Sequence, residues 1–439
     1  MTVNRNDANG VLSQNATFAV MTSLFFIWGF ITALNDILIP HLKAAFDLNY
    51  TQAMLVQFAF FGAYFIVSPF AGKLIDKIGH INGVIAGLVT IALGCGLFYP
   101  AAQMGVYFVF LMGLFVLASG VTLLQVTANP YVASLGDSQS SASRLNLAQG
   151  LNSLGHTLAP LFGALLIFGA VDSANNTGAN SAQSVQLPYL LLGGVMILTA
   201  LTFKFIKLPV YENTVSDKVP VTSNDSIWSQ KRLVLGAGAI FLYVGAEVSI
   251  GSFLVNYFQS LSAPLNSSFN TEGTSDNIAA IDVKTASQMV AYYWGAAMMG
   301  RFVGAALTRY INASLILAIY AICAVILLLT TMISDGNIAI VSVIAVGFFN
   351  SIMFPTIFSL AIKDLGPLTN RGSGLLCQAI VGGALLPLLQ GVVADGISIQ
   401  SSFIVPMLCY FYITAYGVYC LKPEKSATKT TEPYTLQQG

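Results

Sequence analysis

An acidic residue lies deep inside the first long apolar segment of the chain, Asp36 within FFIWGFITALNDILIP. An ionised carboxylate at the centre of a membrane helix costs about 3 kcal/mol on insertion scales, so a neighbouring group must compensate it. Ionisable residues in that setting usually mark the pathway of an ion or a substrate. We expect Asp36 to bind a cation or a proton, with a structural bond to another helix as the alternative.

A second acid, Glu247, lies in the apolar segment LYVGAEVSIGSFL, in the C-terminal half of the chain. A carboxylate can accept hydrogen bonds from two hydroxyl groups at once, or it can titrate. We expect Glu247 to contact a ligand directly. A purely structural hydrogen bond is the alternative.

Amide side chains recur at helical spacing within apolar segments. Gln125 and Asn129 are four positions apart, and Gln149, Asn152 and His156 follow one another at steps of three and four, so each set lies along one helix face. We expect these amides to contact a ligand or to bond neighbouring helices, since Asn and Gln often do the latter in membranes. His156 fits a structural hydrogen bond better than a proton relay.

The composition identifies the solvent of these residues. Apolar residues make up 56% of the 439 positions and charged residues only 8%, against about 25% charged residues in a soluble domain. The 18 basic and 18 acidic residues cancel, which argues against a nucleic-acid partner. The five cysteines lie singly in apolar runs and show no metal or redox spacing. The chain is predicted to be an all-α integral membrane protein whose environment is the lipid bilayer.

A spanning helix needs about 20 mostly apolar residues, and twelve such runs are present. They predict two six-helix halves at 18–208 and 232–421, a polar linker at 209–231, and tails at 1–17 and 422–439. The predicted spans are 18–40, 53–75, 81–101, 106–133, 144–170 and 187–207, then 232–260, 285–309, 313–333, 337–362, 370–395 and 400–421.

Basic residues between the predicted spans give the orientation, because Lys and Arg collect in cytoplasmic loops. Counted over alternate loops, one side holds only Lys43 and Lys284. Both termini and the linker lie on the other side and are predicted to be cytoplasmic, and a bacterial-type inner membrane is expected. The basic residues of that side are Arg5, Lys73, Lys77, Arg144, Lys204, Lys207, Lys218, Lys231, Arg232, Arg309, Lys363, Arg371, Lys422, Lys425 and Lys429.

Two equal halves joined by a cytoplasmic linker are typical of a transporter with its site between the halves. An enzyme is disfavoured because no H-E-x-x-H, P-loop or G-x-S-x-G motif occurs at a plausible place. A non-transporting membrane sensor stays open. We expect the monomer to be the functional unit, although the sequence does not determine the oligomeric state.

Two loop sequences carry a family resemblance. GKLIDKIG, which contains Gly72, Asp76, Lys77 and Gly79, resembles the cytoplasmic loop motif of the major facilitator superfamily, and GRFVGAALTR, from Gly300 to Arg309, resembles its counterpart in the second half. The resemblance implies that the helices form the major facilitator fold. It also implies that the motif residues govern closure of the cytoplasmic side: Gly72, Asp76, Lys77, Gly79, Arg301 and Arg309.

A closer resemblance covers nearly the whole chain. The segments LNDILIP, TANPYVASLG, RLNLAQGLNSLG, YVGAEVSIGSFL and FPTIFSLAIKDLG are similar to the fucose/glucose/galactose symporter family. Asp36 matches the acid of that family's first helix. Gln125 stands where the fucose branch has a Glu, and Glu247 stands where that branch has a Gln, as in the glucose/galactose branch. The resemblance implies a hexose transporter that works by alternating access, with the particular hexose undetermined.

The same resemblance bears on the coupling ion. Gln125 cannot exchange a proton near neutral pH, so a relay through two acids is not available. Asp36 and the carbonyl oxygen of Gln125, with Asn35 or Thr127, offer hard oxygen ligands for a small cation. Similarity to the glucose/galactose branch favours sodium, and a proton bound by Asp36 is the alternative. No other cofactor is expected. The rings of Trp28 and Tyr292 are candidates for stacking on the sugar.

Overall fold

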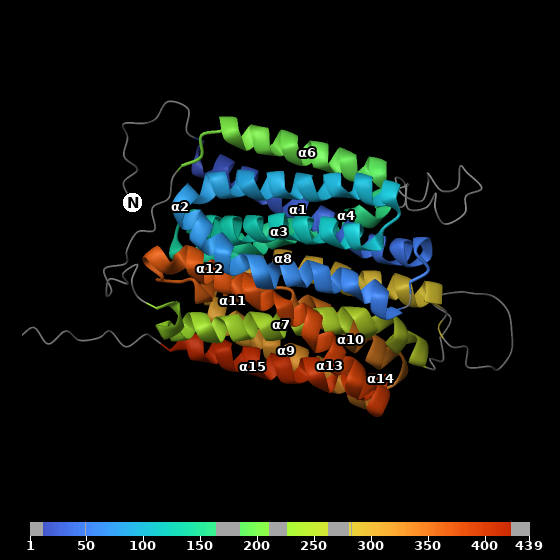
Figure 1. The fold of residues 1–439 in the computed structure, drawn as a ribbon. Coiled ribbons are helices and arrows are strands. Elements are labelled where there is room, and N and C mark those ends of the chain that lie inside the picture. The colour runs from blue at the N-terminus through green and yellow to red at the C-terminus, as the bar shows by residue number, and fades with distance from the viewer. Residues whose placement is uncertain are drawn as a thin grey trace, which may run out of the picture.

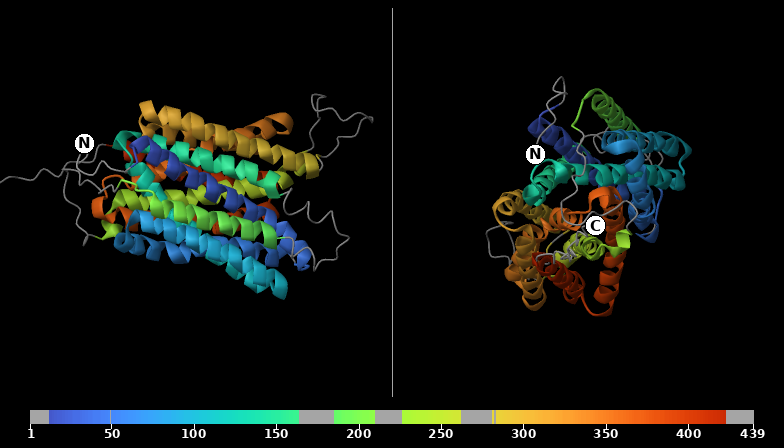
Figure 2. Two further views of the ribbon diagram at one scale, coloured as in Figure 1. Left: turned by 90° about the horizontal axis from the view of Figure 1, so that it is seen from above. Right: turned by 90° about the vertical axis from the view of Figure 1, so that its left-hand side faces the viewer.

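The computed structural model describes residues 12–48, 50–163, 185–209, 226–261, 281 and 283–422, and the long elements within them are all helices. Figure 1 shows these helices side by side, with the N-terminal half in blue to green and the C-terminal half in yellow-green to red. Seen along the helices, the halves form separate groups (Figure 2). The helices of the N-terminal half are α1 (Gln14–Ala45), α2 (Tyr50–Met104), α3 (Tyr107–Ser134), α4 (Ser141–Gly163) and α6 (Gln186–Phe205).

The C-terminal half contains more helices because several of its spans are broken. α10 and α11 together form one predicted span, as do α12 with α13 and α14 with α15. In the N-terminal half, α2 instead contains two spans, which meet at Gly79 with a φ of 79°. The described helices thus correspond to the twelve predicted spans, except that residues 164–170 of the fifth span lie outside the described residues. The remaining bounds are α7 (Lys231–Ser260), α8 (Val283–Tyr310), α9 (Ala313–Ile333), α10 (Gly336–Asn350), α11 (Met353–Ala361), α12 (Thr369–Gln378), α13 (Gly382–Gly396), α14 (Ile399–Ser402) and α15 (Ile404–Leu421).

Nine segments of the described chain are long and apolar enough to cross a membrane. Neither α4 nor α8 is among them, although both lie within the bundle. These two helices are less apolar because they carry polar residues such as Gln149 and Asn152 on α4 and Arg301 on α8. The helices that least resemble ordinary spans are therefore the ones that bring polar groups to the interior.

The ends of both halves lie at one end of the bundle, in agreement with the predicted cytoplasmic location of the termini (Figures 1 and 2). The backbone N–H of Leu12 donates to the carbonyl of Lys207 over 3.1 Å, which joins the start of the first half to its end. In the second half, Arg232 donates to the carbonyl of Cys420 over 3.4 Å. The middle of the linker, 210–225, lies outside the described residues.

The two halves are bonded to each other at this cytoplasmic end. Asp76 of α2 accepts hydrogen bonds from Arg371 over 3.2 Å and from Asn370 over 3.0 Å, both on α12. Gly72 lets the same helices approach, since a Cβ there would lie 2.7 Å from the carbonyl oxygen of Asn370. The side chain of Lys77, which belongs to the same loop motif as Gly72 and Asp76, is exposed. The structure therefore represents a state closed on the cytoplasmic side.

Further inter-half bonds continue this closed seam. Ser143 of α4 donates to the carbonyl of Ala305 on α8 over 2.6 Å. Ser359 of α11 donates to the hydroxyl of Ser141 over 2.8 Å. Each bond is worth only about 1 kcal/mol, which suits a seam that must separate and re-form.

Neutralising Asp76 should loosen the closed seam. Losing an exposed ion pair costs up to about 1 kcal/mol, or roughly a five-fold shift between closed and open states. The measurement is the rate at which Cys377 of α12, which is 0% exposed, reacts with a thiol reagent added from the cytoplasmic side, in a chain whose other cysteines are replaced.

Asp76→Asn should raise that rate several-fold. Asp137→Asn is the matched control, because Asp137 also lies near the cytoplasmic end but caps Gln139 of its own half. An unchanged rate for Asp76→Asn, or an equal rise in the control, would remove Asp76 from the closing contact.

Candidate functional site between the two halves

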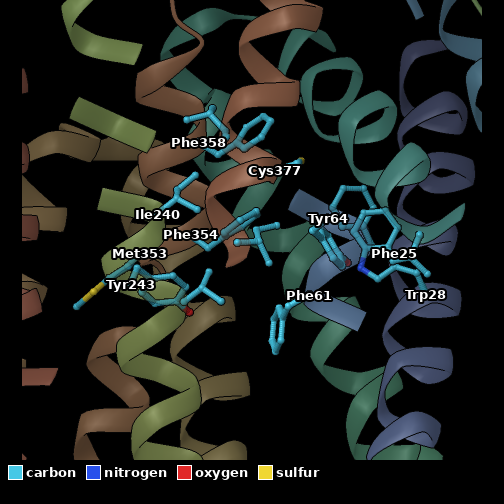
Figure 3. Close-up of a cluster of buried hydrophobic side chains, with 14 of the residues drawn as sticks. Phe25, Trp28, Phe61, Tyr64, Ile240, Tyr243, Met353, Phe354, Phe358 and Cys377 are labelled. Atoms are coloured by element: carbon cyan, nitrogen blue, oxygen red, sulfur yellow. The ribbon is translucent and has the colours of Figure 1, made fainter. Parts of the chain in front are cut away.

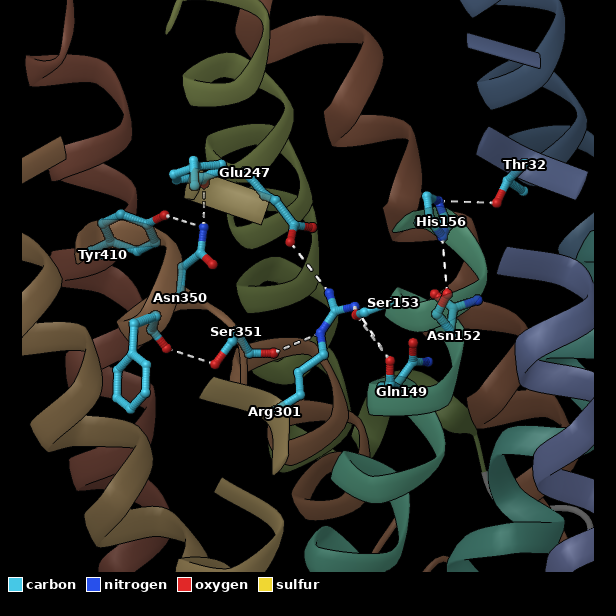
Figure 4. Close-up of polar contacts among 12 residues, drawn as sticks. Thr32, Gln149, Asn152, Ser153, His156, Glu247, Arg301, Asn350, Ser351 and Tyr410 are labelled. Carbon is cyan, nitrogen blue, oxygen red and sulfur yellow. Dashed lines mark hydrogen bonds and ion pairs between the residues drawn. The ribbon is translucent and has the colours of Figure 1, made fainter. Parts of the chain in front are cut away.

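A buried ion pair lies where α4, α7 and α8 meet. Arg301 of α8 and Glu247 of α7 are joined by a contact of 3.4 Å between Nη2 and Oε1, and their side chains are 12% and 14% exposed. Figure 4 shows both side chains pointing into the space between the halves. Charges at this depth are tolerated only when paired and hydrogen-bonded. The structure thus supplies Glu247 with a partner that the sequence analysis had placed elsewhere.

Arg301 also reaches across to the N-terminal half. Its Nη1 donates to the backbone carbonyl of Gln149 over 3.4 Å and to the hydroxyl of Ser153, both on α4. On the opposite side, its Nε donates to the backbone carbonyl of Ser351 over 3.3 Å. The guanidinium is therefore held by groups of both halves, and Arg301 does not belong to a cytoplasmic loop. The role of Arg301 in closing the cytoplasmic side stays a prediction, and its bonds to α4 cross between the halves.

The amide of Gln149 lies beside this arginine and is 7% exposed. Among the described residues, none forms a hydrogen bond with its side chain, in contrast to its backbone carbonyl. An amide offers two donors and two acceptor lone pairs. Gln149 thus keeps its full hydrogen-bonding capacity next to Arg301 and Glu247.

The other polar residues of this α4 face bond α4 to α1. Asn152 donates to the carbonyl of Phe25 over 2.9 Å, and a ring nitrogen of His156 lies 3.1 Å from the hydroxyl of Thr32 (Figure 4). The helices pack closely here because of Gly155, where a Cβ would lie 2.3 Å from the carbonyl oxygen of Phe26. In this state the side chains of Asn152 and His156 form hydrogen bonds between α4 and α1.

Gln125 lies on α3 beside an aromatic cluster. Its Nε2 donates to the hydroxyl of Tyr64 over 2.7 Å, and its carbonyl oxygen accepts no hydrogen bond from another described residue. Trp28 is 2% exposed and packs on Phe25 with ring centroids 4.1 Å apart. Figure 3 shows Phe25, Trp28, Phe61 and Tyr64 on the side of the N-terminal half, facing Tyr243 and Phe354 of the other half.

Three of the expected site residues, Thr127, Asn129 and Tyr292, form no hydrogen bond with Glu247, Arg301 or Gln149 among the described residues. The hydroxyl of Thr127 donates to the carbonyl of Leu123 over 2.6 Å, and its side chain packs on Gly83 of α2. Because residues 125 and 127 point about 200° apart on a helix, Thr127 cannot share a ligand with Gln125. Asn129 is 1% exposed and its amide has no partner among the described residues.

Tyr292 is the third. Its side chain is 57% exposed and shares a helix face with Met299 and Tyr310, which are 57% and 82% exposed. That face of α8 is the outer one, so the structure corrects the expectation that Tyr292 stacks on a ligand. The side chains of Asn35 and Asp36 lie outside the described residues. Arg309, at the end of α8, lies over the ring of Tyr310 at 5.8 Å.

The structure adds residues that the sequence analysis missed. Asn350 of α10 donates to the hydroxyls of Tyr293 over 2.7 Å and Tyr410 over 3.4 Å. Arg371, the partner of Asp76, was counted only as a basic loop residue. Asn350 is an amide inside an apolar run, but it lacks the helical spacing to a second amide that singled out Asn129. Tyr293 could not be separated from its neighbour Tyr292 by sequence, since only the angle around the helix distinguishes them.

A two-half helical bundle with a buried polar cluster at its centre is the architecture of a membrane transporter. The sequence pattern described as Major Facilitator Superfamily matches residues 16–377. The chain therefore belongs to the major facilitator superfamily. This confirms the superfamily and the fold that the loop motifs predicted.

Individual relatives are more specific. The chain is 52% identical to a glucose/galactose transporter of Brucella abortus over 410 residues, or 92% of this chain and 94% of that one. It is 34% identical to the L-fucose-proton symporter of Escherichia coli, with 94% of each chain covered. The crystal structure of a variant of the E. coli fucose:proton symporter FucP matches with a TM-score of 0.81 and 31% identity, covering 94% of this chain and 100% of that one. The resemblance to the fucose/glucose/galactose symporter family is confirmed, and these relatives are transporters rather than enzymes.

Removing one member of the buried ion pair should destabilise the protein more than removing both. Glu247→Leu leaves the Arg301 guanidinium buried without a counter-charge, which costs about 3 to 5 kcal/mol in buried pairs, whereas an apolar replacement of both is close to neutral. We expect a clear fall in the unfolding temperature of purified Glu247→Leu and recovery in Glu247→Leu/Arg301→Met. If the single variant unfolded at the wild-type temperature, the pair would not be desolvated as described.

Proposed function

We propose that this chain is a cation-coupled symporter of a hexose of the glucose/galactose type. The observation that carries the proposal is the buried cluster of Glu247, Arg301 and Gln149 at the junction of the two halves. A carboxylate, a guanidinium and a free amide together offer acceptors and donors that match the vicinal hydroxyls of a sugar. The names of the relatives, a glucose/galactose transporter and a fucose symporter, support the same substrate class.

Each residue has a distinct part in the proposed site. Glu247 accepts hydrogen bonds from sugar hydroxyls while Arg301 keeps its charge balanced. Gln149 donates to or accepts from further hydroxyls. Trp28 and Phe354 supply aromatic surface for the C–H face of the ring, and they are 2% and 9% exposed. Tyr292 is left out because it lies on the outer face of α8.

Transport follows from the position of this cluster between the halves. The seam that includes Asp76 and Arg371 is closed in this structure, so the site would be reached from the opposite side. Rocking of one half against the other would open the seam and release the sugar to the cytoplasm. Arg301 must exchange its contacts with α4 during that motion, since Gln149 and Ser153 belong to the other half.

For the coupling ion we propose sodium, bound by Asp36 and the carbonyl oxygen of Gln125. The amide nitrogen of Gln125 is engaged by Tyr64, which leaves the oxygen as the free end, and oxygen ligands suit a small hard cation. The second candidate is a proton carried by Asp36, which the L-fucose-proton symporter among the relatives favours. Thr127 is left out of the proposed sodium site because its side chain faces α2.

Uptake in sealed vesicles should separate these alternatives. Labelled glucose or galactose should accumulate with an inward sodium gradient, and sodium and sugar should tighten each other's binding by the same factor because coupling between sites is reciprocal. Asp36→Asn should abolish accumulation while leaving exchange of sugar down its gradient. Equal accumulation driven by a pH gradient without sodium would replace sodium by the proton. Binding without any accumulation would identify a sensor.

Gln125→Glu provides a second test of the ion. It adds a titratable carboxyl beside Tyr64 where the wild type has an amide, so uptake should become more sensitive to pH, because the carboxyl can gain and lose a proton and the amide cannot. The isosteric control Glu247→Gln should not add a pH response. A wild-type pH profile for Gln125→Glu would show that this position does not face the ion.

A further inference from the structure

The span formed by α10 and α11 is interrupted beside the central cluster. α10 ends at Asn350 and α11 begins at Met353, yet the backbone between them stays nearly helical, with Ser351 at φ −53° and ψ −41°. Regular bonding resumes where the N–H of Thr356 donates to the carbonyl of Ile352 over 3.1 Å. Helical backbone bonding therefore lapses over this short stretch, although the backbone does not bend into a loop.

Pro355 removes one of the helical bonds at this interruption. In a helix, the N–H of residue 355 would donate to the carbonyl four residues earlier, that of Ser351. Proline has no N–H, so it leaves this carbonyl without its helical donor. A backbone carbonyl without a partner inside a membrane is costly. The donor that replaces the proline N–H is the Nε of Arg301, at 3.3 Å.

The neighbouring helix is shaped to make this contact. Gly300 precedes Arg301 on α8, and a Cβ at Gly300 would lie 2.3 Å from the carbonyl oxygen of Phe348 and 2.3 Å from the hydroxyl oxygen of Ser351. Only glycine allows α8 to lie this close to α10. The close approach places the side chain of the next residue at the freed carbonyl.

The same use of proline occurs twice more among the residues that the structure describes. Pro130 frees the carbonyl of Val126, which accepts from Ser373 of α12 over 2.9 Å. Pro69 frees the carbonyl of Phe65, which accepts from Gln378 over 3.2 Å. In each case the donor is a side chain of another helix.

We propose that Pro355 is a positioning residue for substrate binding, acting through the carbonyl of Ser351, which orients the guanidinium of Arg301. With Nε fixed on that carbonyl, the two terminal nitrogens are directed to Glu247 and to α4. The planar fork of arginine makes this orientation specific, since fixing one N–H fixes the direction of the others. The inference rests on the proposed function, because it assigns Arg301 to the hexose site.

The decisive variant is Pro355→Ala in the full-length protein. Alanine restores the helical N–H, which then competes with Arg301 for the carbonyl of Ser351. We expect the affinity for glucose or galactose, measured by calorimetry, to fall roughly ten-fold. The unfolding temperature should not fall, because a helix hydrogen bond is gained. If the role of Pro355 were purely structural, Pro355→Ala would lower the unfolding temperature and leave the sugar affinity unchanged. Pro100→Ala, in the last turn of α2, is the control and should leave affinity unchanged.

A double-mutant cycle ties the effect to arginine. Lysine has a single charged nitrogen and cannot reach the carbonyl and Glu247 with a fixed fork. Pro355→Ala should therefore weaken sugar binding no further on an Arg301→Lys background. An undiminished ten-fold loss on that background, or unchanged affinity of Pro355→Ala alone, would overturn the proposal.

Two further readouts keep the test independent of other failures. If Pro355→Ala does not fold, Gly300→Ala reaches the same contact from α8 and should give the same loss of affinity, coupled in the same way to Arg301→Lys. If the wild type binds no hexose, the proposed function fails, and the positioning contact is then tested by the coupling of Pro355→Ala and Arg301→Lys in unfolding temperature. Strict additivity there would overturn the positioning role itself.

Discussion

The ion pair between Arg301 and Glu247 constrains the helices around it more than any other contact described above. Two charges at the centre of a membrane bundle are stable only with each other and with a complete set of hydrogen-bonding partners. The surrounding helices meet that requirement in particular ways: α4 offers Gln149 and Ser153, and a proline in α11 frees the carbonyl of Ser351. Part of the polarity that makes α4 and α8 poor membrane spans thus holds this ion pair, and part of it, at Asn152 and His156, joins α4 to α1.

If the sugar binds at this pair as proposed, the pair also connects substrate binding to the arrangement of the halves. Arg301 belongs to the C-terminal half, but two of its acceptors are on α4, so its hydrogen bonds differ between any two arrangements of the halves. A sugar that interacts with Glu247 or Gln149 changes the same set of bonds. A ligand shifts a conformational equilibrium only through contacts that differ between states. The guanidinium meets that condition, whereas the interhelical bonds of Asn152 and His156 lie within one half.

The spans and their grouping into halves were predictable because bilayer thickness fixes the length of an apolar run. Glu247 was predictable as well, since a lone acid in such a run is conspicuous. Its partner was not: Arg301 lies in a segment that resembles a loop motif, and only the packing of α8 shows that it is buried. The choices between Tyr292 and Tyr293, and between the two sides of α3 for Thr127, depend on helix rotation. Sequence spacing fixes relative angles along a helix but not which side faces the other half.

The proposed function requires a hexose to bind at the Arg301–Glu247 pair, between the halves. The most direct measurement is an experimental structure of the full-length protein with glucose or galactose bound. We expect the sugar hydroxyls to lie within hydrogen-bonding distance of Glu247, Arg301 and Gln149. A hexose bound away from all three, with the ion pair and its contacts to α4 unchanged, would contradict it.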